Sequence, residues 1–186
     1  MCLGSLPIDY QVVQHVELGA LTDSSPVILI AHDVLERITA DAASFAGRKE
    51  RGGILIGLRR GPHIEIRDAT LPMRWDFSTF ISFRRSPRGH QSVALRRWRE
   101  SSHTLDWVGE WHSHPEKHPR PSSIDLRSWR AAVEGRGAPM VFVIVGYAAK
   151  WVSLAIPGSL RPIEYRQSET SSAGIAFVDM SQAAKS

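Results

Sequence analysis

The sequence predicts an α/β fold: a mixed β-sheet flanked by helices, within one domain. Short β-branched segments alternate with amphipathic ones, and the 186 residues, 42% of them apolar, suffice for one core. We expect residues 26–160 to form the domain. Residues 1–25, where "YQVVQHVEL" alternates weakly, are expected to be an N-terminal extension or an entering strand. Residues 161–186 are expected to add a C-terminal edge strand and a flexible tail.

The first half of the chain alternates strand and helix patterns. "PVILI" (residues 26–30) is a short β-branched run, and residues 31–47 carry apolar side chains at helical spacing before a glycine. "GGILIGLRRG" (52–61) and "HIEIRDAT" (63–70) flank a glycine turn and predict a hairpin. "FSTFISFRR" (77–85) predicts one further strand.

The second half continues this alternation with more apolar strands. Residues 91–100 predict a helix with one apolar side and one arginine-rich side. "LDWVGEWHSH" (105–114) predicts a strand that runs into two histidines, and residues 122–133 predict a third helix. "MVFVIVGY" (140–147) and "KWVSLAI" (150–156) are almost continuously apolar, which is typical of central strands buried on both faces.

Composition excludes several classes of protein. The one cysteine, Cys2, rules out an intramolecular disulfide framework and a multi-cysteine zinc finger, and it suits a reducing compartment. The chain shows no signal-peptide pattern and no apolar stretch near the roughly 20 residues of a membrane span. We therefore expect a cytoplasmic protein.

The net charge of +4 comes from clustered arginines. These are Arg84, Arg85, Arg88, Arg96, Arg97 and Arg99. Such a patch could meet a nucleic acid or an acidic protein face. It could equally be a solvated helix face, which we favour because no aromatic stacking pattern accompanies it.

The stretch "GEWHSHPEKHPRPSSID" (residues 109–125) concentrates candidate metal ligands. His112 and His114 stand two apart at the end of a predicted strand, so their side chains leave the same face. Asp125 lies in the first turn of the next predicted helix, behind a proline-stiffened loop. Two histidines and one carboxylate around zinc would leave a position for a water, which is a hydrolytic arrangement in principle.

Other interpretations of these residues stay open. Ser122 and Asp125 also have the spacing of a helix capping box, which alone would explain both. Two histidines at this spacing, with no other evidence, are more often surface residues than metal ligands. We expect His118 to be solvent-exposed. A general base must come from elsewhere, because Glu110 and Glu116 are poorly placed for it.

The histidine stretch resembles a known family signature. Residues 112–115 (HSHP), a six-residue spacer and residues 122–125 (SSID) match the HxHPx6SxxD pattern of the JAMM (MPN+, JAB) metalloproteases at every position. The family's other mark is a glutamate ahead of a glycine-rich strand, and "KERGGILIG" supplies Glu50. The resemblance covers about residues 27–156 and implies a JAMM-type, cytidine-deaminase-like α/β domain.

The resemblance also implies roles for these residues. It implies a zinc ion held by His112, His114 and Asp125. Glu50 would be the general base and would return the proton to the leaving amine, while Ser122 would help to steady the oxyanion. The implied reaction is hydrolysis of a peptide or isopeptide bond.

The segments "VGEWHSHP" and "PRPSSIDLRSW", preceded by "FRRSPRGH", are similar to stand-alone bacterial deconjugating isopeptidases of CBASS antiphage operons. These are implied to release targets joined to the C-terminus of a nucleotidyltransferase. An alternative is a JAMM peptidase that processes a sulfur-carrier or ubiquitin-like precursor. Alternatives of other classes are a non-catalytic MPN scaffold and a basic nucleic-acid-binding module, for which we see less support.

The expected partner is a protein with an extended C-terminal tail, either ubiquitin-like or a conjugated nucleotidyltransferase. Such a tail could be added as a strand to an exposed sheet edge. The candidate edge is residues 70–85, which the resemblance places beside the groove that would hold the substrate tail. Its candidate substrate-binding residues are Thr79, Ile81, Arg84 and Arg85.

Overall fold

The computed structural model describes residues 25–44, 49–74, 76–78, 83–84 and 87–180. The strand expected within residues 10–18 lies outside these ranges. Eight strands of the described chain form a closed barrel, and two more form a separate small sheet. The barrel strands are β1 (Val27–Ile30), β2 (Gly52–Arg60), β3 (His63–Ala69), β6 (Asp106–Ser113), β7 (Met140–Val145), β8 (Lys150–Ala155), β9 (Ile163–Ser171) and β10 (Gly174–Asp179).

The barrel has the order β1-β10-β9-β8-β7-β6-β2-β3 and closes where β3 pairs with β1. The β1–β3 and β6–β7 pairs are parallel, and the other pairs are antiparallel. The sheet is therefore mixed, as the sequence predicted. Its closure was not predicted, because local sequence patterns do not specify which distant strands pair.

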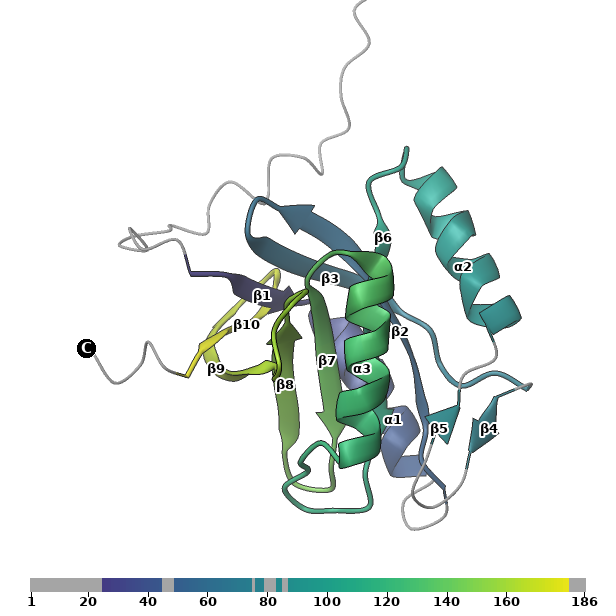
Figure 1. Ribbon diagram of the computed structural model, residues 1–186, viewed down its shortest axis with the longest axis vertical. Coiled ribbons are helices and arrows are strands. Elements are labelled where there is room, and N and C mark those ends of the chain that lie inside the picture. The colour runs from purple at the N-terminus through teal and green to yellow at the C-terminus, as the bar shows by residue number, and fades with distance from the viewer. Residues whose placement is uncertain (1–24, 45–48, 75, 79–82, 85–86, 181–186) are drawn as a thin grey trace, which may run out of the picture.

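Three helices of the described chain pack against the barrel strands: α1 (His32–Ser44), α2 (Pro87–Glu100) and α3 (Ser123–Arg136). Figure 1 shows α3 toward the viewer beside β7, with α1 behind α3 and α2 to one side. The three predicted helices are thus confirmed, and α2 begins earlier than expected, at Pro87. None of the described helices is long and apolar enough to cross a membrane.

Strand β7 separates two apolar cores. Val141, Val143 and Val145 belong to the larger core, together with the buried side of α1. Met140, Phe142 and Ile144 belong to the second core, with Trp129 and Val133 of α3. Because side chains alternate along a strand, one strand serves both cores. All six β7 residues are buried, which confirms the predicted central strand.

The expected C-terminal edge strand is present as β10, but it is not at an edge. It pairs with β1 on one side and with β9 on the other. Strand β9 was not predicted, because its sequence "IEYRQSETS" is mostly polar and only Tyr165 is buried. Its role in the sheet is to bridge β8 and β10.

The prediction of one continuous strand over residues 77–85 was wrong. The structure has two short strands, β4 (Phe77–Ser78) and β5 (Phe83–Arg84), which pair antiparallel with each other. Phe77 stands opposite Arg84, and Ser78 opposite Phe83, so the chain reverses between them. Figure 1 places this small sheet at the end of the molecule where β2 and α3 begin.

Candidate metal centre

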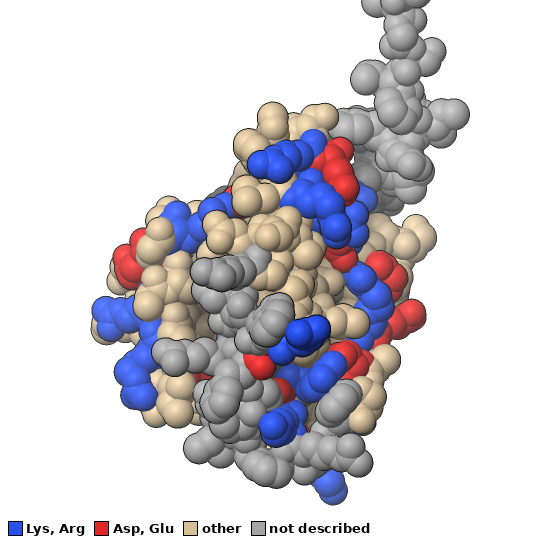
Figure 2. Space-filling view, turned by 90° about the vertical axis from the view of Figure 1, so that its right-hand side faces the viewer, with Lys and Arg blue, Asp and Glu red and all other residues tan. Residues whose placement is uncertain are grey.

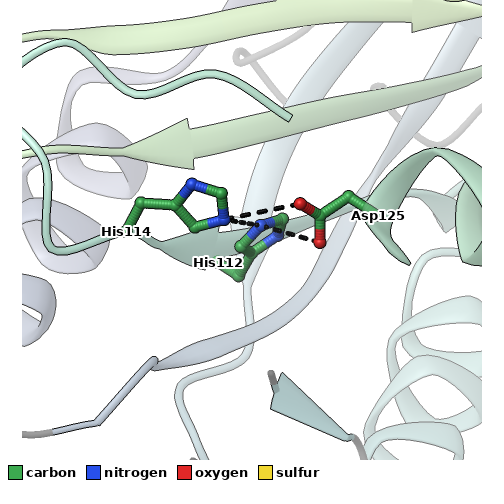
Figure 3. Close-up of side chains that lie close together, drawn as sticks. All are labelled: His112, His114 and Asp125. Carbon is green, nitrogen blue, oxygen red and sulfur yellow. Dashed lines mark hydrogen bonds and ion pairs between the residues drawn. The ribbon is translucent and has the colours of Figure 1, made fainter. Parts of the chain in front are cut away.

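The end of β6 and the start of α3 bring three candidate ligands together. His112 is paired with Gly52 of β2 and with Ile144 of β7, so it stands on a strand held on both sides. The His114 amide donates to the carbonyl of Val145, which keeps this residue in line with the sheet. Figure 3 shows both imidazoles and the Asp125 carboxylate pointing toward one another.

The three side chains have the spacing of a tetrahedral metal site. The Nε2 atoms of His112 and His114 lie 3.0 Å apart. Asp125 Oδ1 is 3.4 Å from His112 Nε2, and Oδ2 is 3.5 Å from His114 Nε2. Ligands at about 2.0–2.1 Å from a tetrahedral ion are separated by about 3.3 Å. Both histidines are buried, so this donor set could hold an ion such as zinc.

Asp125 is oriented by a capping box at the start of α3. The backbone amide and the hydroxyl of Ser122 both donate to Asp125 Oδ2, each at 2.7 Å. In return the Asp125 amide donates to Ser122 Oγ at 3.2 Å. The capping interpretation is therefore confirmed, and the same carboxylate also faces the histidines. An oxyanion role for Ser122 would require its hydroxyl to leave Asp125.

The electrostatics of the cluster favour a bound cation. Burial alone would raise the pKa of Asp125, but hydrogen bonds with His112 and His114 hold it well below its usual range. Burial alone would lower the pKa of His114, but Asp125 and Glu50 together raise it above its ordinary value. The carboxylate is therefore ionised near neutral pH, as a metal ligand must be.

Glu50 lies beside the cluster without belonging to it. Its carboxylate Oε1 is 3.8 Å from His114 Nε2, and the residue is only 7% exposed. Burial raises its pKa to about 7, with a smaller contribution from Asp125, while His114 opposes the shift. A pKa near the working pH suits a general base, because the group can then both take up and release a proton.

The contact that joins the residue after Glu50 to β6 was not predicted from the sequence. Ser113, the middle residue of the histidine motif, donates its amide to the Arg51 carbonyl at 2.8 Å. The Arg51 amide donates to Ser113 Oγ at 2.9 Å. Ser113 stands between the two histidines in sequence, which is the one signal that could have singled it out.

Of the remaining predicted residues, His118 and Arg84 lie in the described part of the chain. His118 is exposed, as expected. Arg84 belongs to β5, which pairs with β4 in the small sheet. Thr79, Ile81 and Arg85 lie outside the described residues, so their substrate-binding role stays a prediction.

The basic face of α2 is partly neutralised by acidic partners. Arg97 donates to Asp68 at 2.8 Å and to Glu100 at 3.3 Å. Arg96 lies 3.8 Å from Glu100 on the solvent side. On the side of the molecule that carries α2, basic and acidic side chains are interspersed (Figure 2). This pairing fits the solvated helix face that the sequence favoured.

Comparison with known proteins assigns the family. Residues 32–156 match the family described as prokaryotic homologs of the JAB domain. The chain belongs to this JAB family. The JAB match spans both halves of the site, from α1 ahead of Glu50 to the end of β8, and it confirms the resemblance found in the sequence.

Curated relatives of this JAB-family chain match more than three quarters of its length. The chain is 36% identical to a CD-NTase/cGAS isopeptidase of Pseudomonas aeruginosa over 79% of its own length and 94% of the relative. It is 30% identical to a protein of the same name from Escherichia coli, over 80% of this chain and 94% of that one. A Vibrio cholerae protein of that name is 31% identical, over 76% and 90%.

A solved structure also resembles this JAB chain in fold. Protein DSY2949 of Desulfitobacterium hafniense superposes with a TM-score of 0.52 at 22% identity. The match covers 82% of this chain and 90% of that protein. At this identity the similarity concerns the fold alone.

Proposed function

We propose that this protein is a zinc-dependent isopeptidase that removes proteins conjugated to the C-terminus of a CD-NTase-like partner. The observation that carries the proposal is the convergence of His112, His114 and Asp125 beside the buried Glu50. The names of the three relatives, CD-NTase/cGAS isopeptidase, support the reaction and the partner. The proposed role is deconjugation in a CBASS-like antiphage system in the cytoplasm.

The chain's own residues divide the chemistry between them. His112, His114 and Asp125 would hold the ion, and Ser122 keeps Asp125 aimed at it through two hydrogen bonds. When bound, zinc would supply Lewis-acid chemistry by acidifying a water and stabilising negative charge on the substrate carbonyl. Glu50 would accept the proton from the water and deliver it to the leaving amine. The Ser122 hydroxyl would help to steady the oxyanion after leaving Asp125, which the Ser122 backbone amide would still orient.

The substrate tail is proposed to lie along residues 70–85. Strands β4 and β5 pair only with each other in the described chain, so their outer sides can accept a further strand. Thr79 and Ile81 would contact the tail there. Arg84 and Arg85 would suit an acidic or carboxylate-bearing partner surface.

The proposal is tested by cleavage of a CD-NTase joined through its C-terminus to a lysine side chain of a second protein. Wild type loaded with one zinc per chain should cleave it. Glu50→Gln should retain the zinc yet lose about 10²-fold or more in kcat, because it removes the base and keeps the shape. His112→Ala and Asp125→Ala should lose zinc as well as activity, since too few ligands remain.

Two outcomes would contradict the proposal. Near-normal turnover by Glu50→Gln would mean that another carboxylate is the general base, and Glu110 would be the first to test. Full zinc occupancy in Asp125→Ala would remove Asp125 from the ligand set. His118→Ala is the matched control, because this exposed histidine of the same loop should affect neither zinc content nor kcat.

A further inference from the structure

Next to Glu50, the side chain of Arg51 makes a bidentate ion pair with Asp41 of helix α1. Arg51 Nε donates to Asp41 Oδ2 at 2.7 Å, and Nη2 donates to Oδ1 at 2.5 Å. The two side chains are only 20% and 10% exposed. A bidentate pair between a guanidinium and a carboxylate fixes the orientation of both groups as well as their separation.

The backbone of Arg51 is held from the opposite side by β6. Its amide donates to Ser113 Oγ, and its carbonyl accepts the amide of Ser113. The next residue, Gly52, is paired with His112. Arg51 is therefore fixed to α1 by its side chain and to the ligand strand by its main chain.

We propose that Asp41, Arg51 and Ser113 are positioning residues that set the distance between the Glu50 carboxylate and the metal ligands. The inference rests on the proposed role of Glu50. A base must come within about 2.6–3.2 Å of the atom that carries the proton it takes, and a displacement of about 1 Å can cost about 10²-fold in rate. Glu50 directly precedes Arg51, so loss of the ion pair would free the backbone that carries the base.

The ion pair could instead serve only to anchor α1. A second ion pair in the same molecule separates these roles. Asp68 of β3 accepts from Arg37 of α1 at 2.7 Å and from Arg97 of α2 at 2.8 Å. Its side chain is 14% exposed, close to the 10% of Asp41, but it lies on β3 and its ion pairs join α1 and α2. Asp68→Asn is therefore a matched control for Asp41→Asn.

The first experiment compares the two variants in the zinc-loaded protein with the isopeptide substrate. Asp41→Asn should lower kcat about 10- to 100-fold, with KM within about twofold and zinc content unchanged. Asp68→Asn should lower the melting temperature by a similar amount and keep the wild-type kcat. Arg51→Lys should retain a higher kcat than Arg51→Ala, because lysine keeps the positive charge beside Asp41 although it cannot form the bidentate contact.

A second measurement is independent of activity. The Arg51 amide is hydrogen-bonded to Ser113, so its hydrogen exchange reports how firmly this backbone is held. Asp41→Asn should accelerate exchange at Arg51 at least tenfold, whereas Asp68→Asn should leave it unchanged. Both variants can be measured in the metal-free protein.

The outcomes separate this inference from the proposed function. If Glu50→Gln is inactive but Asp41→Asn has wild-type kcat and wild-type Arg51 exchange, the positioning role is overturned. Equal losses of kcat in Asp41→Asn and Asp68→Asn would likewise reduce the ion pair to a structural anchor. If wild type itself cleaves no isopeptide bond, the proposed function fails. Faster hydrogen exchange at Arg51 in Asp41→Asn, but not in Asp68→Asn, would still show that the ion pair holds the backbone next to Glu50.

Discussion

Glu50 is an acidic side chain that folding places where water is scarce. Its pKa is raised from an ordinary value of 4.5 to about 7, chiefly by burial. In the metal-free protein the carboxyl is therefore neutral in the folded state over a range where it is charged in the unfolded chain. The neutral carboxyl stabilises the fold below pH 4.5, and this contribution is lost as the pH rises through about 7.

We therefore expect Glu50→Gln to stabilise the metal-free protein at high pH. Glutamine has nearly the same shape and no charge to desolvate. A shift from 4.5 to about 7 corresponds to a difference on the order of 3 kcal/mol between pH 4 and pH 8.5. Urea unfolding of wild type and variant at both pH values measures it. An equal difference at the two pH values would mean that burial does not govern this carboxyl.

Strand β6 carries His112 and leads directly into His114, and its close approach to β7 depends on Gly109. A Cβ placed on Gly109 would collide with the carbonyl oxygen of Val141, its partner on β7. Backbone atoms cannot move aside as a flexible side chain can. The register of these two strands, and with it the position of His112, is therefore sensitive to one methyl group.

Gly109→Ala should lower the free energy of unfolding by about 1–3 kcal/mol or more and weaken zinc retention, because β6 must shift away from β7. Gly135→Ala in α3 is the control, since nothing lies within 4 Å of a Cβ there. That change should be neutral or stabilise the helix by up to about 1 kcal/mol. Denaturant melts with metal analysis measure both, and equal effects of the two changes would refute the steric argument.

Elements with a clear apolar period could be predicted from the sequence, and those without one could not. Helices α1 and α3 and the barrel strands up to β8 follow from residue spacing, because each contributes buried apolar side chains to a core. The spacing over residues 77–85 did not show that the chain reverses between β4 and β5. Strand β9 could not be predicted from the sequence, because most of it is held by backbone hydrogen bonds to its neighbours and not by buried apolar side chains. The grouping of His112, His114 and Asp125 follows from a local sequence motif. The pairing of Arg51 with Asp41 instead depends on how α1 packs against the sheet.

At the scale of the whole molecule, the barrel depends on its last two strands. Strands β9 and β10 join β8 to β1 and contribute Tyr165 and Phe177 to the larger core. Our expected domain boundary at residue 160 would place both strands outside the catalytic domain. Without them, β8 would lose a partner and the core would be open on one side.

A chain ending at residue 160 should therefore fail to unfold cooperatively, because the larger core is exposed. A chain ending at residue 180 keeps all eight barrel strands and should melt like the full protein. Thermal melts followed by circular dichroism compare the two. A cooperative melt of the 1–160 chain near the full-length temperature would instead support the boundary at 160.

Closure of the barrel also decides where another polypeptide can be recruited through its main chain. Each of the eight strands has two neighbours, so much of the barrel's backbone is already paired, although β9 pairs with β8 only through Ile163, Glu164 and Tyr165. Among the described residues, unpaired strand sides occur on β4 and β5, at the end of the molecule where β2 and α3 begin. Within the described residues, β4 and β5 thus offer an incoming strand a place to pair at the end of the barrel where β2 and α3 begin.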